Sequence, residues 1–269
     1  MSALYNGQLM HASVGDYAIT DSPKARPNKI FRAREPYLSL TRRALRFIDL
    51  SGEEQDSMAS LTLLDDLGQG YVLSTTGTPG VKVELFEGKF LPISAFRIAS
   101  FPRVRDEDVF VWVPSAMEYA KQEARDSIYK QEDAKFVQLL DSALEAWDGG
   151  AEHIFQFNKF HRLSKFDRER AAGHINEHEI TAFAYLVHPR DRAYLNVDWS
   201  NTVLESTYVP RGRAYLLCDP DYLGALVSYY GLREVDNPLP EQFYQGAVCD
   251  ELISMVIVNP RGIVRFDWV

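Results

Sequence analysis

The chain has little cysteine, no long apolar run and no excess of basic residues. Cys218 and Cys249 are too few for a disulfide framework, which favours a reducing compartment. No apolar run reaches the ~18 residues needed to cross a bilayer, and residues 1–20 lack the basic head and apolar run of a signal peptide. The formal net charge of −9 argues against electrostatic binding of DNA or RNA by the chain as a whole. This composition is typical of a soluble globular protein of one or two domains.

The patterns of common catalytic and cofactor sites are also missing. The chain has no G-x-x-x-x-G-K-[ST] phosphate loop, no G-x-G-x-x-G nucleotide pattern, no C-x-x-C pair and no G-x-S-x-G elbow. Cys218 ends the apolar run AYLLC and is expected to pack as a small hydrophobe rather than act as a nucleophile. We therefore assign no catalytic, cofactor-binding or metal-binding residue, and expect neither enzyme activity nor a cofactor.

One pattern does suggest metal chemistry. His174, Glu177 and His178 fit H-x-x-E-H, in which two histidines on one helix face bind zinc and the glutamate activates a zinc-bound water. Glu251 could be imagined as a third ligand. The surrounding residues do not resemble an inverted-zincin site, however, so a polar helix face with Glu177 and Glu179 near the histidines is the preferred explanation of the pattern. A zinc metallopeptidase is kept as a distant alternative.

The most informative stretch is residues 114–147, which contain no interior proline or glycine and are followed by Gly149 and Gly150. Apolar residues recur there at steps of three or four, which predicts an amphipathic helix about 50 Å long. Its first half carries only a thin stripe at Ala120 and Ala124, and its second half is broadly apolar from Phe136 on. We expect the first half to be solvated or to lie under hairpins of its own or neighbouring subunits, and the second half to lie in a core. An isolated coiled coil is the alternative, although the stripe is not a clean heptad repeat.

The residues before this helix read as an arm followed by β-structure. Residues 1–36 predict an extended arm, or a solvated leader, with a basic cluster between Pro23 and Arg34. Residues 51–54 look like a turn that opens a short helix. Residues 70–86 form two β-rich runs around a Gly-Thr-Pro-Gly turn, which predicts a long hairpin that must lie on other structure.

The residues after Gly150 mix helix and strand. Residues 155–187 have helical character, residues 208–217 read as a strand, and Asp219 is a candidate N-cap for a helix over residues 221–231. Residues 253–258 and 263–268 are predicted strands joined by an Asn-Pro-Arg-Gly turn, so the C-terminus should be part of a sheet. Without clean βαβ alternation, the expected fold class is α+β.

This order of arm, hairpin, long helix and mixed domain resembles the Hong Kong 97-type major capsid protein of tailed double-stranded DNA bacteriophages. The resemblance covers roughly Leu61 to the end of the chain. The passages that carry it are residues 70–105, 131–144, 180–195, 209–226 and 250–266.

The resemblance implies an N-terminal arm and short helix over residues 1–60 and an extended loop and peripheral domain over residues 61–149, with the spine helix at 114–147. It implies an axial domain over residues 150–269. Many copies would form the pentamers and hexamers of an icosahedral shell in the virion. The shell, assembled in the host cytoplasm, would enclose genomic DNA without sequence-specific binding.

The same resemblance bears on partners. No long charged helical segment precedes the arm, so a separate scaffolding protein is expected, with a portal and possibly a decoration protein. Encapsulins, which are cellular compartments with the same fold, are the alternative, but their usual helical N-terminus is not evident. Some members of the family crosslink a hairpin lysine to an asparagine of a neighbour. Lys82 or Lys89 could serve, yet no acceptor can be identified, so no site is assigned.

Overall fold

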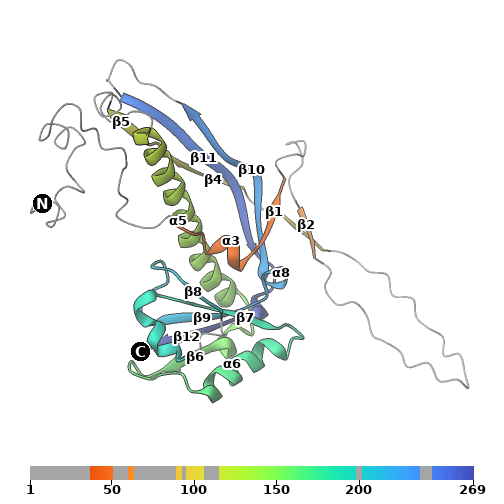
Figure 1. The fold of residues 1–269 in the computed structure, drawn as a ribbon. Helices are drawn as coiled ribbons and strands as arrows, with labels where there is room; N and C mark the ends of the chain where they lie inside the picture. The colour runs from red at the N-terminus through yellow and green to blue at the C-terminus, as the bar shows by residue number, and fades with distance from the viewer. Residues whose placement is uncertain are drawn as a thin grey trace, which may run out of the picture.

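The computed structural model describes residues 37–50, 60–63, 89–92, 95–105, 115–197, 202–236 and 244–269. One long helix, α5 (Ser115–Ala146), connects two regions, each built on a five-stranded sheet (Figure 1). We call these the upper sheet, which lies along the first part of α5, and the lower sheet, which lies at its C-terminal end (Figure 1). The mixture of helices with largely antiparallel sheets is the α+β class that the sequence predicts.

The predicted spine helix is present with nearly the predicted bounds. It ends at Ala146, and a 3-10 turn, η2 (Gly150–His153), follows. A Cβ atom on Gly150 would lie 1.9 Å from the carbonyl oxygen of Leu144, so only glycine allows the chain to turn back this closely. Pro114, the first residue of the predicted helix, lies outside the described residues.

The upper sheet is built on two long antiparallel strands, β10 (Gly224–Asp236) and β11 (Tyr244–Ile257). β1 (Arg46–Asp49) pairs parallel with β10, and both β4 (Phe96–Ser100) and β5 (Arg103–Arg105) pair antiparallel with β11. α5 packs against β11, β4 and β5. The sheet thus joins strands from all three predicted domain ranges, and the division into domains stays a prediction.

The lower sheet has the order β6-β12-β9-β7-β8. Its strands are β6 (Ile154–Phe157), β7 (Ala182–Val187), β8 (Thr202–Glu205), β9 (Arg213–Cys218) and β12 (Ile263–Trp268). The last strand has the predicted bounds and pairs with β6 on one side and β9 on the other, so the C-terminus is part of a sheet as expected. Helix α6 (Lys165–Asn176) begins at a capping box between Ser164 and Asp167.

Short elements connect these strands. They are α3 (Thr41–Ala44), η3 (Pro189–Asp191), α7 (Arg192–Leu195), α8 (Pro220–Leu223) and η5 (Pro260–Gly262). A separate antiparallel pair consists of β2 (Ser60–Leu63) and β3 (Lys89–Pro92), in which Leu63 lies opposite Lys89. The predicted hairpin at residues 70–86, the turn at 51–54 and the arm at 1–36 lie outside the described residues.

Three sequence-based assignments were wrong in type or extent. The helix predicted over residues 221–231 is only the single turn α8, because β10 begins at Gly224. There the backbone approaches β11 so closely that a Cβ atom would lie 2.2 Å from the carbonyl oxygen of Val256. Helix in residues 155–187 is limited to α6, and the strand predicted over 208–217 begins only at Arg213. Short apolar runs do not distinguish a buried strand from a buried helix.

The C-terminal half of α5 lies in the main core, as predicted. Phe136, Leu140 and Leu144 are almost fully buried and belong to the cluster that fills the space around the lower sheet. In the first half, Ala124 is only 3% exposed and packs with Ile128 and Cys249 of its own chain, so at this position the expected cover comes from the same subunit. The thin stripe is thus an intramolecular contact with the upper sheet at this position.

Candidate functional site: buried ion pairs and an open groove along the long helix

Asp133 of α5 binds residues 37–41, the first residues that the structure describes. Its carboxylate accepts hydrogen bonds from the backbone N–H groups of Leu40 (3.0 Å) and Thr41 (2.9 Å). It also accepts from the hydroxyls of Thr41 (2.7 Å) and Tyr37 (2.6 Å). Burial and this bond to Asp133 raise the pKa of Tyr37. Because several donors replace the lost hydration of a fully buried carboxylate, the segment is fixed firmly to the middle of α5.

The neighbouring residue Glu132 takes part in a second buried contact. Arg42 donates to Glu132 (2.9 Å) and to Glu251 of β11 (2.7 Å), and both glutamates are fully buried. Burial raises the pKa of Glu132 to about 7, against the opposing effect of Arg42. Two carboxylates share one guanidinium here, which ties α3 to both α5 and β11. Glu251 is therefore a partner of Arg42 rather than the imagined third zinc ligand.

A fourth buried acid, Asp250, joins three strands of the upper sheet. It accepts from Arg97 of β4 (2.6 Å), Arg233 of β10 (3.1 Å) and the hydroxyl of Tyr230 (2.8 Å). Burial alone would raise the pKa of Asp250, but the hydrogen bonds from Tyr230 and the two arginines outweigh it and leave the pKa lowered. The acid therefore stays ionised and holds β4, β10 and β11 in register.

Further ion pairs fix α5 at both ends. Near its start, Lys121 pairs with Asp236 (2.9 Å) and Arg125 with Glu234, both at the far end of β10. In the second half, Asp141 accepts from Arg213 (2.6 Å), Tyr215 (2.8 Å) and Arg265 (3.3 Å) of the lower sheet. α5 is thus connected to both sheets by charged contacts as well as by packing.

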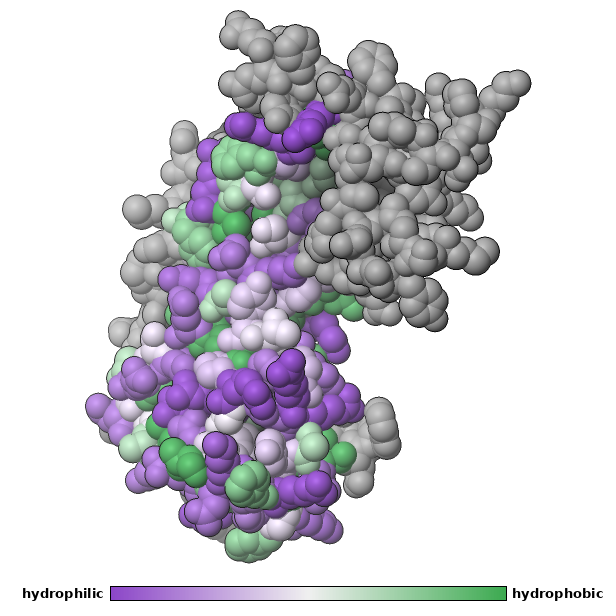
Figure 2. Space-filling model, turned by 90° about the vertical axis from the view of Figure 1, so that its left-hand side faces the viewer, coloured by the Kyte–Doolittle hydropathy of each residue, from purple (hydrophilic) through white to green (hydrophobic). Residues whose placement is uncertain are grey.

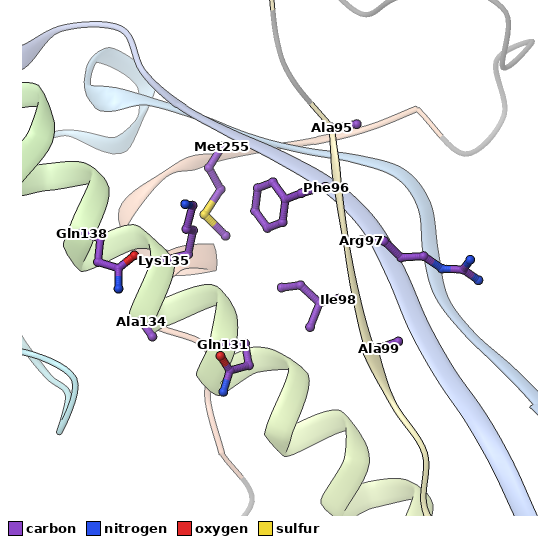
Figure 3. A pocket seen from close by; sticks show the side chains of 10 residues that line it. All are labelled: Ala95, Phe96, Arg97, Ile98, Ala99, Gln131, Ala134, Lys135, Gln138 and Met255. Atoms are coloured by element: carbon purple, nitrogen blue, oxygen red, sulfur yellow. The ribbon is translucent and has the colours of Figure 1, made fainter.

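An open groove of about 660 Å³ lies between α5 and β4 (Figure 3). Phe96 and Ile98 point toward α5 while Arg97 points away, and Met255 of β11 completes the apolar part of the lining. The helix contributes Gln131, Ala134, Lys135 and Gln138. β4 ends the pairing path of the upper sheet, so the groove lies beside a sheet edge. The lining combines apolar side chains with amides and one lysine, which is better suited to a contact with another surface than to chemistry on a substrate.

The histidines of the H-x-x-E-H pattern lie in a different cluster. His174 is in the last turn of α6, and the ring of His153 lies 5.3 Å from that of His174 and 5.9 Å from that of His178. Burial, then His174 and His178, lower the pKa of His153, whose Nδ1 lies 2.8 Å from the carbonyl oxygen of Ile263. In the described part of the chain, no group of three or more His, Cys, Asp or Glu side chains is arranged to hold a metal ion. The rings serve as packing between η2 and α6.

The other candidate residues have plain structural roles or remain untested. Cys218 is fully buried, and burial raises the pKa of its thiol to about 12, so it stays protonated and packs as predicted. Lys82 lies outside the described residues, and the side chain of Lys89 in β3 is not described, so the crosslinking hypothesis is untested. No helix in the described ranges is long and apolar enough to cross a membrane.

Sequence reasoning missed the acids that organise the structure. The sequence does contain a sign that these acids are buried. In β11, Asp250 and Glu251 interrupt an otherwise apolar strand, and in α5, Glu132 and Asp133 lie beside the apolar stripe. Charged residues at such positions are rarely buried unless they are paired. Arg42, the partner of Glu132 and Glu251, lies 90 or more positions from each of them in sequence, and local patterns do not reveal such pairings.

No protein-family model and no curated protein sequence matches this chain. Solved structures with the same fold do match. A chain from Mycobacterium phage Bobi aligns with a TM-score of 0.66 and 13% identity over 94% of this chain and 98% of its own. The capsid of a native GTA particle aligns at 0.62 and 10% identity, over 95% and 97%. The holo-SrpI encapsulin complex from Synechococcus elongatus PCC 7942 aligns at 0.61 and 10% identity, over 95% of both chains.

These likenesses extend over nearly the whole of each chain. The Hong Kong 97-type capsid fold predicted from the sequence is therefore confirmed. At 10–13% identity the likeness concerns the fold alone.

Proposed function

We propose that this chain is the major capsid protein of a tailed double-stranded DNA phage. Many copies assemble as pentamers and hexamers into an icosahedral head that encloses the genome. The observation that carries this proposal is the fold shared with the capsid of the native GTA particle over 95% of this chain and 97% of that one. No catalytic role is proposed.

The shape and charge of the subunit are consistent with this role. The subunit is elongated along α5, with one sheet beside the helix and the other at its end (Figure 1). Hydrophilic residues predominate over much of the lower region in Figure 2, with isolated hydrophobic spots. A net charge of −9 disfavours tight binding of the enclosed DNA, so contact with the genome should be independent of its sequence.

The domain ranges, the partners and the place of assembly are part of the same proposal. Residues 1–60 form an arm and short helix, residues 61–149 an extended loop and peripheral domain, and residues 150–269 an axial domain. The partners are other copies of the chain, a separate scaffolding protein, a portal and possibly a decoration protein. Assembly takes place in the host cytoplasm, and the product is the virion shell. These assignments rest on the family resemblance.

Electron microscopy of the purified full-length chain tests the proposal. We expect closed shells or rings of five and six subunits, either alone or after co-expression with a scaffolding protein. Sedimentation velocity gives an independent measure of particle mass. A folded chain that stays monomeric at high concentration, with and without a scaffold, would contradict the assignment.

A cellular compartment is the second candidate, because the encapsulin complex aligns with almost the same score as the capsids. The contents of particles isolated from their natural source distinguish the two functions. DNA that resists nuclease inside the particle supports the phage head. A packaged protein cargo without DNA supports the encapsulin.

A further inference from the structure

The arginines of β4, β5 and β10 all lie on the face of the upper sheet that points away from α5. Figure 3 shows Arg97 of β4 pointing away from the helix, and along residues 96–105 every odd-numbered residue is exposed. β4 and β5 pair with β11 in one continuous register, so Arg103 and Arg105 share the face of Arg97. Arg233 of β10 joins them, because it binds the same buried acid of β11 as Arg97 does. We call this surface the arginine face.

The acids of the same strands lie mostly on the opposite face. Glu234 and Asp236 of β10 pair with bases of α5, and Glu251 of β11 pairs with Arg42 of α3. Among the residues of β4, β5, β10 and β11, Asp250 is then the only acid on the arginine face, and it is fully buried. One face of these strands therefore carries an excess of positive charge, in a chain whose formal net charge is −9.

Asp250 neutralises only one of the two arginines that bind it. Arg97 donates to it through Nε (2.6 Å), and Arg233 donates through Nε (3.1 Å) and Nη2 (3.2 Å). Both guanidiniums are 52% exposed, and an arginine has five N–H groups, so each keeps donors for a further acceptor. Because the shared acid holds two like charges close together, an anion that binds beside them is stabilised. The pair forms a preorganised site for an anionic oxygen.

Arg103 extends the positive charge along the sheet. It is exposed and has no ion pair in the described part of the chain. Arg103 lies six residues from Arg97, which corresponds to about 20 Å along extended strands. Three acids at positions 106–108 follow Arg105 directly and lie outside the described residues, so Arg105 is left out of the site.

The shape of the arginine face suits a polyanion better than a small ligand. The groove lies between β4 and α5, on the other side of the strand, and the arginine face is the outer surface of a sheet (Figure 3). Double-stranded DNA carries one negative charge per about 1.7 Å of its axis, so a row of about 20 Å faces several phosphates in any register. An acidic protein would need carboxylates at matching positions. Arginine also binds phosphate through paired hydrogen bonds.

We propose that the arginine face, at Arg97, Arg233 and Arg103, is the surface through which the subunit contacts the phosphate backbone of double-stranded DNA. The choice of DNA as the polyanion rests on the proposed function, whereas the separation of charge between the two faces of the sheet does not. With so few phosphate contacts the binding is weak, reversible and independent of base sequence, as suits a chain that is acidic as a whole. In an assembled shell the arginine face then faces the interior.

Binding of a short labelled DNA duplex to the purified full-length chain, measured by fluorescence anisotropy, tests this contact. Sedimentation velocity first establishes conditions in which all variants are unassembled. We expect the logarithm of the binding constant to fall with the logarithm of the salt concentration with a slope of about −3, because each neutralised phosphate contributes about −0.9. Arg103→Gln combined with Arg233→Gln should bring this slope to about −1 and weaken binding at low salt about tenfold. Duplexes of unrelated sequence should bind equally well.

Matched variants keep the result interpretable. Arg233→Gln leaves Asp250 with its other partners, so no buried acid loses all its donors. Arg103→Gln alone serves if the double variant does not fold, and it should reduce the steepness of the salt dependence by about one. Lys159→Gln combined with Arg162→Gln removes the same charge from exposed positions of the lower region and should leave DNA binding unchanged. No DNA binding by the original chain, or an equal loss in this control, would overturn the proposal.

Two other results would assign the arginine face to a protein partner and would contradict DNA binding there. One is competition by polyglutamate that is as strong as competition by unlabelled DNA of the same total charge. The other is a variant with Arg103→Gln and Arg233→Gln that binds DNA normally but no longer forms rings or shells.

The same measurements separate this inference from the proposed function. Shells that form normally from a chain that does not bind DNA would overturn the inference and leave the capsid assignment intact. A chain that stays monomeric under all conditions but binds DNA through Arg103 and Arg233 would contradict the capsid assignment and support the DNA contact.

Discussion

The two halves of α5 are held in place by different forces. The C-terminal half inserts Phe136, Leu140 and Leu144 into the main core. The N-terminal half has only a small apolar contact around Ala124 and Ile128, supplemented by ion pairs from Lys121 and Arg125 to the end of β10. Apolar burial stabilises in proportion to area, whereas ion pairs that are partly exposed, as these are, add little and depend on geometry. One half therefore provides stability, and the other positions the helix on its sheet.

The largest effect on stability is expected from a charge in the C-terminal, apolar half of α5. Leu140→Asp places a carboxylate with no partner at a site that is 0% exposed, and we expect the chain to fail to fold. Circular dichroism and solubility give the readout. Glu145→Asp, at an exposed position of the same helix, is the control and should behave like the original chain. A cooperatively folded Leu140→Asp variant would show that the core tolerates local opening there.

Loss of the Asp133 contact should rank second. Asp133→Ala leaves the N–H groups of Leu40 and Thr41 without their acceptor in a buried place. We expect the free energy of unfolding to fall by about 3 kcal/mol. Urea denaturation measures the loss, and hydrogen exchange should show it first in residues 38–45. Asp133→Asn, which retains one acceptor oxygen, should lose less, and equal losses in the two variants would contradict this explanation.

The matched substitution in the polar half should cost less than Leu140→Asp. Ala124→Asp introduces a charge into a cluster of only a few residues, and we expect a loss of about 2 kcal/mol with the lower sheet intact. Hydrogen exchange resolved by region separates the two halves. If Ala124→Asp and Leu140→Asp cause equal and global unfolding, the proposed difference between the halves does not hold.

Glu132 should give a smaller, pH-dependent effect. Its pKa is about 7 in the folded chain, above its value in the unfolded chain. The folded state therefore binds the proton more tightly, and the resulting stability is full below the unfolded pKa and is lost as the pH rises through about 7. Between pH 5 and 8, we expect the free energy of unfolding to fall more steeply in the original chain than in Glu132→Gln. If the free energy of unfolding depends on pH in the same way in both chains, Glu132 is excluded as the source of the loss of stability with rising pH.

His153 acts in the opposite direction and needs its own control in that experiment. Because its folded pKa is lowered, its contribution is present above the unfolded pKa and is lost as the pH falls through the folded value. Making the comparison in chains that also carry His153→Gln removes this loss of stability at low pH. In that background, any remaining difference in pH dependence of the free energy of unfolding between the chain with Glu132 and the Glu132→Gln variant is due to the buried carboxylate alone.

The smallest effect on stability is expected from the ion pairs that Lys121 and Arg125 form in the N-terminal half of α5. Lys121→Ala and Arg125→Ala are each expected to lower the free energy of unfolding by less than about 1 kcal/mol, and less still at high salt. Thermal unfolding at low and high ionic strength measures this. A loss as large as that of Asp133→Ala would mean that the polar half contributes more stability than its burial indicates.

The sequence could predict features that depend on local pattern. The bounds of α5 follow from its apolar spacing and the Gly149-Gly150 stop, and β12 follows from strict alternation after a turn. The order of elements was enough to predict the fold through a family resemblance. No candidate site residue from the sequence became part of the buried ion network except Glu251, and its role there is different.

Features that depend on distant contacts could not be predicted. The run after Leu223 is apolar enough for either a helix or a strand, and it becomes β10 because β1 and β11 are available on its two sides. The side chain that covers Ala124 could not be identified, because its partner Cys249 comes from the far end of the chain. Similarly, the pairing of Arg42 with Glu132 and Glu251 depends on three elements that meet only in the folded chain.

The upper sheet also has a consequence for the order of folding. β10 and β11 are neighbours in sequence and pair over most of their length, so they can form a hairpin early with a small loss of chain entropy. β1, β4 and β5 come from much earlier in the chain and can join only when a template exists. The hairpin of β10 and β11 is therefore the expected folding nucleus of this region, and substitutions within it should slow folding more than those in β4.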